Sequence, residues 1–372
     1  MKRVIDVDAE LNKLESKIGN MSIQPATLFD IHFIKDCLIS NNSISEALVE
    51  LRKYLCTCNS SAIDMVLHLG ILETLWNLTK SLVDKDVYEI CWILTNLSAG
   101  NEQQTEILVN NGIIELMSQL LTSTSDEVVV QAAWCLGNIS GDQKDYRERI
   151  MVNLSSYNGL SFFMSRKSMQ SEFPLKVFAW VLSNLCRLQP SNEYWGFIVI
   201  DLQVCIYNLD IFNCNDEQTI IDFCWALTRC LHSVESLHRK QLVNAALVDG
   251  IFGVVSRFNR PNVLIPVFRV LTNIVAGDDQ ETFHVVANDK IEVIVGFLNV
   301  KNNPLLKECL MCLSNIAASN THGSKLHHST ILLQILSMLQ SENTDVVKLE
   351  CLWILSNCSS MNEVLLQYLL FI

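Results

Sequence analysis

The sequence predicts an all-α protein built as a solenoid of helical repeats. The first observation is repetition, because a six-residue segment returns seven times with its apolar and polar positions aligned. The second is that apolar residues recur at helical spacing between these segments. The third is composition: hydrophobic residues make up 49% of the chain and charged residues 18%. A chain of this kind buries a continuous core, so we expect it to be folded rather than disordered.

The repeated segment sets the register of the solenoid. Its copies are CWILTN at 91–96, AWCLGN at 133–138, AWVLSN at 179–184, CWALTR at 224–229, FRVLTN at 268–273, LMCLSN at 310–315 and LWILSN at 352–357. Successive copies are separated by 42, 46, 45, 44, 42 and 42 residues. This period is typical of armadillo or HEAT repeats, whereas other helical repeats are shorter, at about 33 or 34 residues. We expect about eight repeats of three helices in a right-handed superhelix.

The elements follow in order along the chain. Residues 1–24 are predicted to be a short segment, a remnant or a frayed helix, and residues 25–372 the solenoid. The first helical material runs from Ile31 to about Cys58. Each later repeat is read as a short helix, a turn, a second helix, a polar linker and a long helix that ends in the repeated segment. Inner turns are predicted at Asn111-Gly112, Asn158-Gly159 and Asp249-Gly250, because glycine ends a helix at positive φ.

Composition and spacing exclude several classes of function. The net charge of -13 disfavours nucleic-acid binding and favours a basic partner, although an acidic surface that only confers solubility is the alternative. No apolar run is long enough for a membrane helix, and no signal peptide is present, so we expect an intracellular protein. Many of the 14 cysteines lie inside apolar helical runs, where a thiol packs as a small hydrophobe. We find no spacing typical of a metal, cofactor or catalytic site and expect no enzyme.

Tryptophan and asparagine return together within the repeated segment. Four copies contain both residues: Trp92 and Asn96, Trp134 and Asn138, Trp180 and Asn184, and Trp353 and Asn357. Residues four apart lie on one face of a helix. The leucine between them occupies the same position in every copy and is predicted to be the buried residue. The tryptophan and asparagine are therefore predicted to lie to its side, on a surface that binds a ligand.

Four segments carry a resemblance to a known family. They are QAAWCLGNISGD at 131–142, ILTNLSAGNEQQT at 93–105, AWVLSNLCR at 179–187 and VLTNIVAGDDQET at 270–282. From about residue 45 to its end the chain closely resembles importin alpha (karyopherin alpha), the adaptor that binds nuclear localisation signals of cargo proteins. The resemblance implies a nuclear import adaptor of the cytoplasm and nucleus, with no direct contact to nucleic acid or membrane.

The resemblance also implies a major peptide-binding groove. Its residues would be Trp92, Asn96, Gly100, Thr105, Gln131, Trp134, Asn138, Asp142, Trp180, Asn184 and Arg187. The asparagines would hold the main chain of an extended peptide with both ends of the carboxamide. The tryptophans would form slots for lysine or arginine stems. Asp142 would pair with the key lysine, beside the carbonyl of Gly100 and the hydroxyl of Thr105.

A weaker minor groove is implied in the second half of the chain. Its residues would be Arg269, Asn273, Glu308, Asn315, Glu350, Trp353 and Asn357, with the two glutamates supplying charge. Met311 replaces a family tryptophan there and loses the aromatic face. Arg269 agrees with the family, whereas Arg229 replaces a usual aromatic residue and adds positive charge. We therefore expect a competent major groove and an impaired minor one.

Two departures from the family bear on partners. The family has a long basic N-terminal arm that recruits importin beta, but the first residues here offer only Lys2, Arg3, Lys13 and Lys17 among comparable acids. Importin beta is thus a weaker expectation than a basic cargo peptide, and the groove is predicted to be constitutively open. The family's last repeats are also not matched. The alternative function is an armadillo scaffold, or a regulatory relative that sequesters partners without importin-beta-dependent transport.

Overall fold

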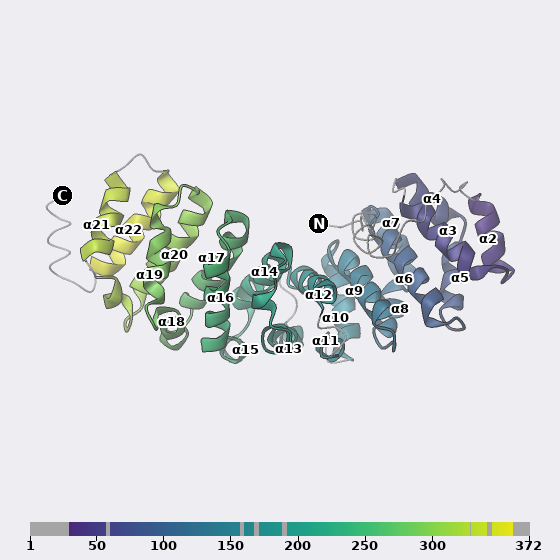
Figure 1. Cartoon of the computed structure of the whole chain (residues 1–372), viewed down its shortest axis with the longest axis horizontal. Coiled ribbons are helices and arrows are strands. Elements are labelled where there is room, and N and C mark those ends of the chain that lie inside the picture. Colours follow the sequence, from purple (N-terminus) through teal and green to yellow (C-terminus); the bar gives the residue numbers. More distant parts are fainter. Residues whose placement is uncertain are drawn as a thin grey trace, which may run out of the picture. The chain divides into compact units, whose positions relative to one another are not determined.

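The computed structural model describes residues 30–56, 60–156, 160–166, 171–187, 192–327, 329–340 and 344–359. Regular structure in these ranges is helical, and no strand occurs in them, as the sequence predicts (Figure 1). The chain divides into two compact units, Met1–Pro190 and Ser191–Ile372. The predicted segment 1–24 and the predicted turn at Asn158-Gly159 lie outside the described residues.

The first unit contains four long helices that pack in series. Its helices are α2 Ile31–Ile39, α3 Ile44–Cys56, α4 Ser60–His68, α5 Ile71–Leu78, α6 Asp84–Ser98, α7 Glu102–Asn110, α8 Ile113–Leu120, α9 Asp126–Ser140, α10 Lys144–Ser155, α11 Ser161–Met164 and α12 Glu172–Leu185. Helix α3 packs on α6, α6 on α9 and α9 on α12 (Figure 1). The long helices α6, α9 and α12 each end in one copy of the repeated segment, so the segments come together in this unit.

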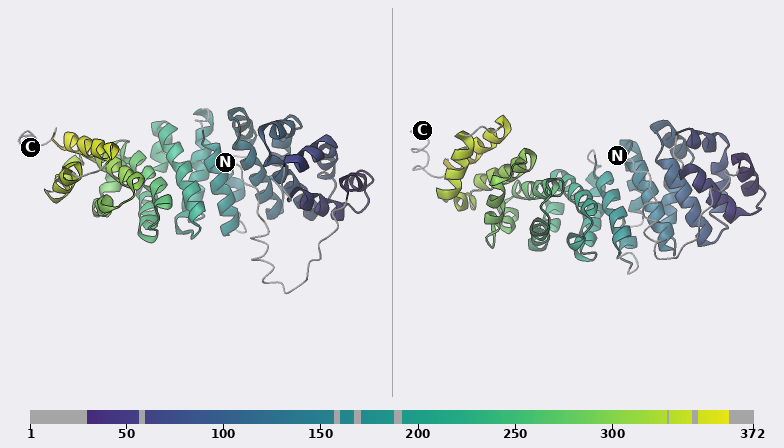
Figure 2. Two further views of the ribbon diagram at one scale, coloured as in Figure 1. Left: turned by 90° about the horizontal axis from the view of Figure 1, so that it is seen from above. Right: turned by 45° about the horizontal axis from the view of Figure 1, so that its top comes forward.

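The second unit repeats this plan. Its helices are η2 Asn192–Tyr194, α13 Trp195–Tyr207, η3 Ile211–Asn213, α14 Glu217–Ser233, α15 Ser236–Leu242, α16 Ala245–Arg257, α17 Pro261–Val275, α18 Asp279–Val286, α19 Lys290–Gly296, η4 Phe297–Asn299, α20 Asn303–Ala318, η5 Gly323–Leu326, α21 Ser329–Gln340 and α22 Asp345–Ser359. Helix α14 packs on α17, α17 on α20 and α20 on α22 (Figure 2). The long helices again carry the repeated segments.

Local chemistry fixes where the long helices begin and end. The hydroxyl of Ser125 accepts the backbone N–H of Val128 at the start of α9, and Asp126 and Glu127 occupy its first turn. Both features stabilise a helix N-terminus, because they satisfy an unpaired N–H and complement the helix dipole. Helix α9 ends at Ser140, and Gly141 follows. These signals place the repeated segment at the C-terminal end of its helix.

One predicted inner turn is confirmed and one is wrong. Gly112 has a φ of 82° and separates α7 from α8, as predicted. Asp249 and Gly250 instead lie inside α16. A Cβ atom on Gly250 would lie 2.3 Å from Cδ2 of Phe212, so this glycine serves close packing of a helix against an aromatic ring rather than a turn. The sequence pattern does not distinguish these two uses of glycine.

The core follows the register. The leucine of every copy is buried: Leu94, Leu136, Leu182, Leu227, Leu271, Leu313 and Leu355. Cys91 and Cys135 are also buried, as predicted for core thiols. Burial raises the pKa of the Cys135 thiol to about 12, so it stays protonated and packs as an apolar group. Among the described helices, none has the length and apolar character needed to cross a bilayer.

Candidate functional site

The asparagines of the repeated segment join adjacent repeats in the first unit. Asn138 Nδ2 in α9 donates to the backbone oxygen of Thr95 in α6 at 3.2 Å. Asn184 Nδ2 in α12 donates to the backbone oxygen of Gly137 in α9 at 3.0 Å. In each pair the acceptor is the residue immediately before the equivalent asparagine of the preceding repeat. We call this series of bonds the asparagine ladder.

The ladder continues with the same register in the second unit. Its bonds are Asn273 Nδ2 to Thr228 O at 2.9 Å, Asn315 Nδ2 to Thr272 O at 3.3 Å and Asn357 Nδ2 to Ser314 O at 3.1 Å. Thr228 precedes Arg229, which stands where the other copies of the segment have asparagine. The backbone oxygen of Thr228 thus accepts the ladder bond although its own copy has no asparagine. The ladder therefore depends on each asparagine and on the backbone of the repeat before it.

The ladder corrects the predicted exposure of the asparagines. Asn138 has no exposed surface, and Asn96 and Asn184 are only 4% exposed. A carboxamide can be buried when its polar atoms find partners. The neighbouring repeat supplies Thr95 O and Ser98 Oγ to Asn138, and Gly137 O to Asn184. At least one amide hydrogen of Asn138 and of Asn184 is thus committed to the fold. These asparagines therefore have a structural role in the fold, and their predicted role in holding the main chain of a peptide stays a prediction.

The tryptophans of the first unit are also less exposed than predicted. Trp92 and Trp180 are buried, and Trp134 is partly buried. The ring centroid of Trp134 lies 6.1 Å from that of Trp180, at an interplanar angle of 59°. It lies 5.7 Å from the centroid of Phe173, which is seven residues before Trp180 on the same face of α12. Trp134 therefore contacts two aromatic rings of the next repeat.

A glycine sets the position of Trp180. A Cβ atom on Gly137 would lie 2.5 Å from Cζ3 of Trp180 and 2.9 Å from Cγ2 of Val181. Neither distance is available to a real Cβ atom, so the indole rests directly on the α9 backbone. Gly137 immediately precedes Asn138 and also accepts the ladder bond from Asn184. One backbone position therefore places both a tryptophan and an asparagine of the next repeat.

Three buried polar atoms of this surface have no hydrogen-bond partner. They are the indole Nε1 atoms of Trp92 and Trp134 and the Oδ1 atom of Asn138. A buried unpaired donor or acceptor costs about 1–3 kcal/mol relative to a paired one. They lie on α6 and α9, which pack on each other. These atoms could therefore gain bonds from a ligand that presents both acceptors and N–H donors.

The predicted lysine-binding residues lie near positive charge. Asp142 follows α9, and its negative charge opposes the lowering of the Arg147 pKa that burial and the neighbouring Arg187 cause. Arg147 is 3% exposed, and its Nη1 donates to the backbone oxygen of Ser140 at 2.7 Å. The charges of Asp142 and Arg187 therefore both act on Arg147, and this part of the surface carries positive as well as negative charge.

Three other predicted residues lie on or between the helices α6, α7 and α9. Thr105 is buried in α7, and its hydroxyl donates to the backbone oxygen of Asn101 at 3.1 Å. Its oxygen can still accept a hydrogen bond. Gly100 lies between α6 and α7, and Gln131 is buried in α9.

The second unit contains a polar cavity of about 360 Å³ that is lined by one predicted minor-groove residue, Asn315. Its lining includes Gly277, Asp278, Thr282, Asn315 and Ser319. Gly277 and Thr282 were not among the predicted site residues. They stand four and nine residues after Asn273, as Gly100 and Thr105 stand after Asn96, so the repeat register could have found them.

Glu308 does not supply the minor groove with uncompensated charge. It is 3% exposed, and both of its carboxylate oxygens accept hydrogen bonds from Arg269. The bonds to Glu308 raise the pKa of the Arg269 guanidinium further. The prediction that Glu308 provides charge to a ligand is therefore corrected, because its partner is already within the chain. Trp353, by contrast, is 53% exposed.

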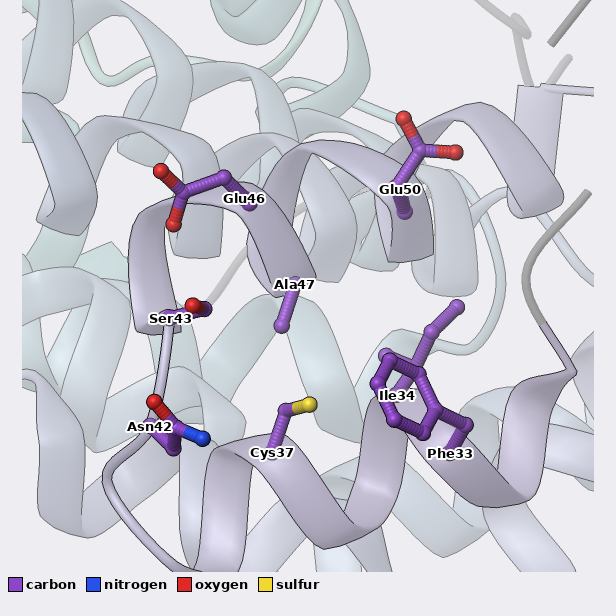
Figure 3. Close-up of a pocket in the computed structure, with 8 residues that line it drawn as sticks. All are labelled: Phe33, Ile34, Cys37, Asn42, Ser43, Glu46, Ala47 and Glu50. Carbon is purple, nitrogen blue, oxygen red and sulfur yellow. The ribbon is translucent and has the colours of Figure 1, made fainter.

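A second cavity lies outside both sets of predicted residues. It has a volume of about 260 Å³ and lies between α2 and α3 (Figure 3). Phe33, Ile34 and Cys37 line its apolar part, while Glu46 and Glu50 stand at its edge. The described residues contain no cluster of three His, Cys, Asp or Glu side chains that could hold a metal ion.

Comparison with known proteins supports the repeat assignment. The family model of the armadillo/beta-catenin-like repeat matches residues 101–141, which span α7 to the end of α9. The crystal structure of an engineered protein matches with a TM-score of 0.74 and 23% identity, covering 89% of this chain and 78% of that one. At this identity the match supports the fold alone.

Several curated relatives are importin alpha subunits. Importin subunit alpha-1a of Oryza sativa subsp. japonica is 29% identical over 285 residues, which cover 75% of this chain and 52% of the relative. Importin subunit alpha-2 of the same organism is 30% identical over 84% of this chain and 59% of the relative, and importin subunit alpha-2 of Caenorhabditis elegans is 26% identical over 84% and 60%. The chain spans about half to three fifths of the length of these relatives. With its helical repeats and asparagine ladder, the chain is an importin-alpha-like armadillo-repeat protein.

Proposed function

We propose that the first unit binds basic nuclear localisation signals as extended peptides, and that the protein acts as an adaptor in nuclear import. The observation that carries the proposal is the set of three unpaired buried atoms on α6 and α9. An extended peptide presents a carbonyl and an N–H at every residue, and so offers partners for the two indole N–H groups and for Asn138 Oδ1.

The chemistry of the groove favours basic side chains. The net charge of -13 attracts a cationic peptide over a distance limited by salt screening. Trp134 and its neighbours offer aromatic faces, each of which stabilises a cation by about 0.5–2 kcal/mol. Asp142 is the residue we propose for pairing with a ligand lysine, with Gly100 and Thr105 offering further oxygen acceptors. The cargo would be recognised in the cytoplasm and released in the nucleus, without enzymatic chemistry.

The same logic extends less strongly to the second unit. There the cavity beside Asn315, Gly277 and Thr282 supplies polar acceptors, and Trp353 supplies one exposed aromatic face. Met311 and the internal Arg269–Glu308 pair remove two of the features that would bind a basic residue. We propose a secondary, weaker peptide site in this unit.

Fluorescence anisotropy with a labelled lysine-rich octapeptide tests the proposal. We expect a Kd below about 1 μM that weakens steeply with salt, because the attraction is electrostatic. A glutamate-rich peptide of equal length is the control. No binding of the lysine-rich peptide would favour the alternative, an armadillo scaffold for another ligand. A pull-down with importin beta then separates a transport adaptor, which is retained, from a relative that sequesters cargo, which is not.

A further inference from the structure

The first unit has a rung that the repeated segment does not reveal. Asn96 Nδ2 contacts Sγ of Cys56 in α3 at 3.5 Å, across a separation of 40 residues. This contact differs from the asparagine ladder in that its acceptor is a side-chain sulfur rather than a backbone oxygen, but it likewise joins an asparagine to the preceding repeat. Arg52 stands four residues before Cys56 and 40 residues before Trp92. Arg52 therefore occupies, in the first repeat, the position that tryptophan holds in the next three.

Two contacts fix the guanidinium of Arg52 over the ring of Trp92. Its Cζ atom lies 4.1 Å from the ring centroid, which is a cation–π distance. Its Nε donates to Oε2 of Glu89 at 2.6 Å, and the two side chains are only 16% and 12% exposed. Glu89 stands three residues before Trp92 on α6. The arginine is thus held by an aromatic face and a carboxylate, the two groups that a groove of this kind offers to a ligand cation.

The surroundings of this pair are partly dehydrated. The ring of Tyr88 meets the ring of Trp92 edge-on, with centroids 5.6 Å apart. Burial and the negative charge of Glu89 raise the pKa of Tyr88 to about 12. Low hydration strengthens both the ion pair and the cation–π contact of Arg52, because water screens charges less there. The guanidinium is therefore a fixed part of this surface rather than a mobile surface charge.

The second unit contains a similar Arg–Glu pair, although its two residues are 39 apart rather than 37. Arg269 is at a tryptophan position and bonds to Glu308, which stands three residues before position 311 of the next copy. That next position is Met311, however, so no aromatic ring lies there. Of these two arginines, Arg52 is the one that an aromatic ring of the next repeat faces.

We propose that Arg52 is a specificity-determining residue that fills one face of Trp92 in place of a ligand's basic side chain. The inference rests on the proposed function of the first unit. Because the face of Trp92 toward α3 is occupied, a bound peptide can place cations only from Trp92 onward, toward Trp134 and Trp180. An additional basic residue that reaches toward α3 meets a like charge and no open ring. The groove therefore selects short basic clusters whose flank on this side is neutral or acidic.

The test compares Arg52→Met with Arg149→Met. Methionine keeps the apolar stem of Arg52 and removes its charge and planar group. Arg149 is the matched control, because it pairs with Glu115 on the exposed surface of α8 and α10, where both side chains are more than two fifths exposed. Two kinds of labelled peptide are titrated. The short peptide is a lysine cluster, and the extended peptide has one further lysine, placed two residues before the cluster in one version and two residues after it in the other. Alternate residues of an extended chain point to the same side.

We expect wild type and Arg149→Met to bind the extended peptide less tightly than the short one, because the further lysine meets the charge of Arg52. Arg52→Met should bind the extended peptide about three- to thirtyfold more tightly, the range of one cation–π contact, and the short peptide unchanged. Equal affinities of Arg52→Met for both peptides would overturn the proposal. Arg52→Gln, which removes the charge but can still hydrogen-bond to Glu89, is the second variant if the methionine variant does not fold. It should show the same gain for the extended peptide, and equal affinities for both peptides would again overturn the proposal.

Acrylamide quenching of Trp92 separates this inference from the proposed function. The Trp92 contribution is obtained by difference from a Trp92→Phe background. We expect Trp92 to be quenched at least about twofold more strongly in Arg52→Met than in Arg149→Met, because stacking of the arginine side chain shields the indole from the quencher. Unchanged quenching would overturn the inference even if peptides bind. Increased quenching without any peptide binding would instead support the Arg52 contact and refute the proposed function.

Discussion

Asn184 in α12 donates its side-chain amide to the backbone oxygen of Gly137 in α9, 47 residues earlier in the chain. This bond joins two repeats through a residue of the proposed ligand surface. Stability and recognition are therefore coupled at this position, and changes there should affect both.

Replacement of Asn184 by alanine should lower the free energy of unfolding by about 1–3 kcal/mol. The bond to Gly137 O is buried, and its loss leaves an acceptor without its partner. Urea denaturation followed by circular dichroism measures the change. Asn153→Ala is the control, because that amide bonds to Arg149 O within its own helix on the exposed surface. Equal losses in both variants would contradict a structural role for the ladder.

Replacement of Gly137 by alanine should destabilise the first unit by about 1–3 kcal/mol and weaken peptide binding. The new methyl group would overlap Trp180 and force the indole off α9. Gly253→Ala is the matched control, since a Cβ atom there meets nothing within 4 Å in helix α16. That variant should gain up to about 1 kcal/mol, because alanine favours a helix interior. In thermal unfolding, the midpoint temperature should fall for Gly137→Ala and rise for Gly253→Ala.

Replacement of Asp142 by lysine should nearly abolish binding of a lysine-rich peptide. Loss of one partner in a desolvated charge pair costs about 2–5 kcal/mol, and the new positive charge repels the lysines of the peptide. Asp145→Lys makes the same change of net charge at an exposed position of α10 and should reduce affinity only slightly. If anisotropy gives the same loss for both variants, general electrostatics rather than pairing with Asp142 accounts for binding.

Trp180→Ala should weaken a peptide with one basic cluster more than Trp353→Ala does. Trp180 rests on Gly137 and beside Trp134 in the first unit. The equivalent position in the copy before Trp353 is Met311, which has no aromatic ring. Isothermal titration of both variants, with circular dichroism to confirm folding, measures the ranking. Equal losses would show that the two units contribute equally to the binding of such a peptide.

The wild-type protein should lose stability relative to a Glu350→Gln variant as pH rises, because Glu350 then becomes charged. Burial, and then the charge of Glu308, raise the pKa of Glu350 in the fold. A carboxyl group with a raised pKa contributes stability while it is protonated, and that contribution is lost as pH rises through the folded-state pKa. Urea unfolding at about pH 5 and about pH 7 measures the difference between the two proteins. A gap that does not change with pH would contradict the raised pKa.

The repeat register alone predicted much of the fold. The buried leucines, the long helices that end in the repeated segment and the turn at Gly112 follow from periodicity and from the conformational freedom of glycine, which are properties of the local sequence. The predicted turn at Gly250 was wrong, because glycine is needed there for close contact with Phe212 rather than for a turn. Such a contact joins elements that the local sequence does not relate.

Periodicity is enough to identify the positions that recur on one face of each long helix, because the 3.6-residue period and the repeat length set their phase. What those positions contact depends on tertiary packing. In the folded chain the asparagine amides donate hydrogen bonds to the preceding repeat, Glu308 pairs with Arg269, and Arg52 lies over Trp92. These partners lie some 40 residues apart, and their pairing depends on how one helix stacks on the next. Phase places a side chain on a surface, but packing between repeats determines whether that surface is left for a ligand.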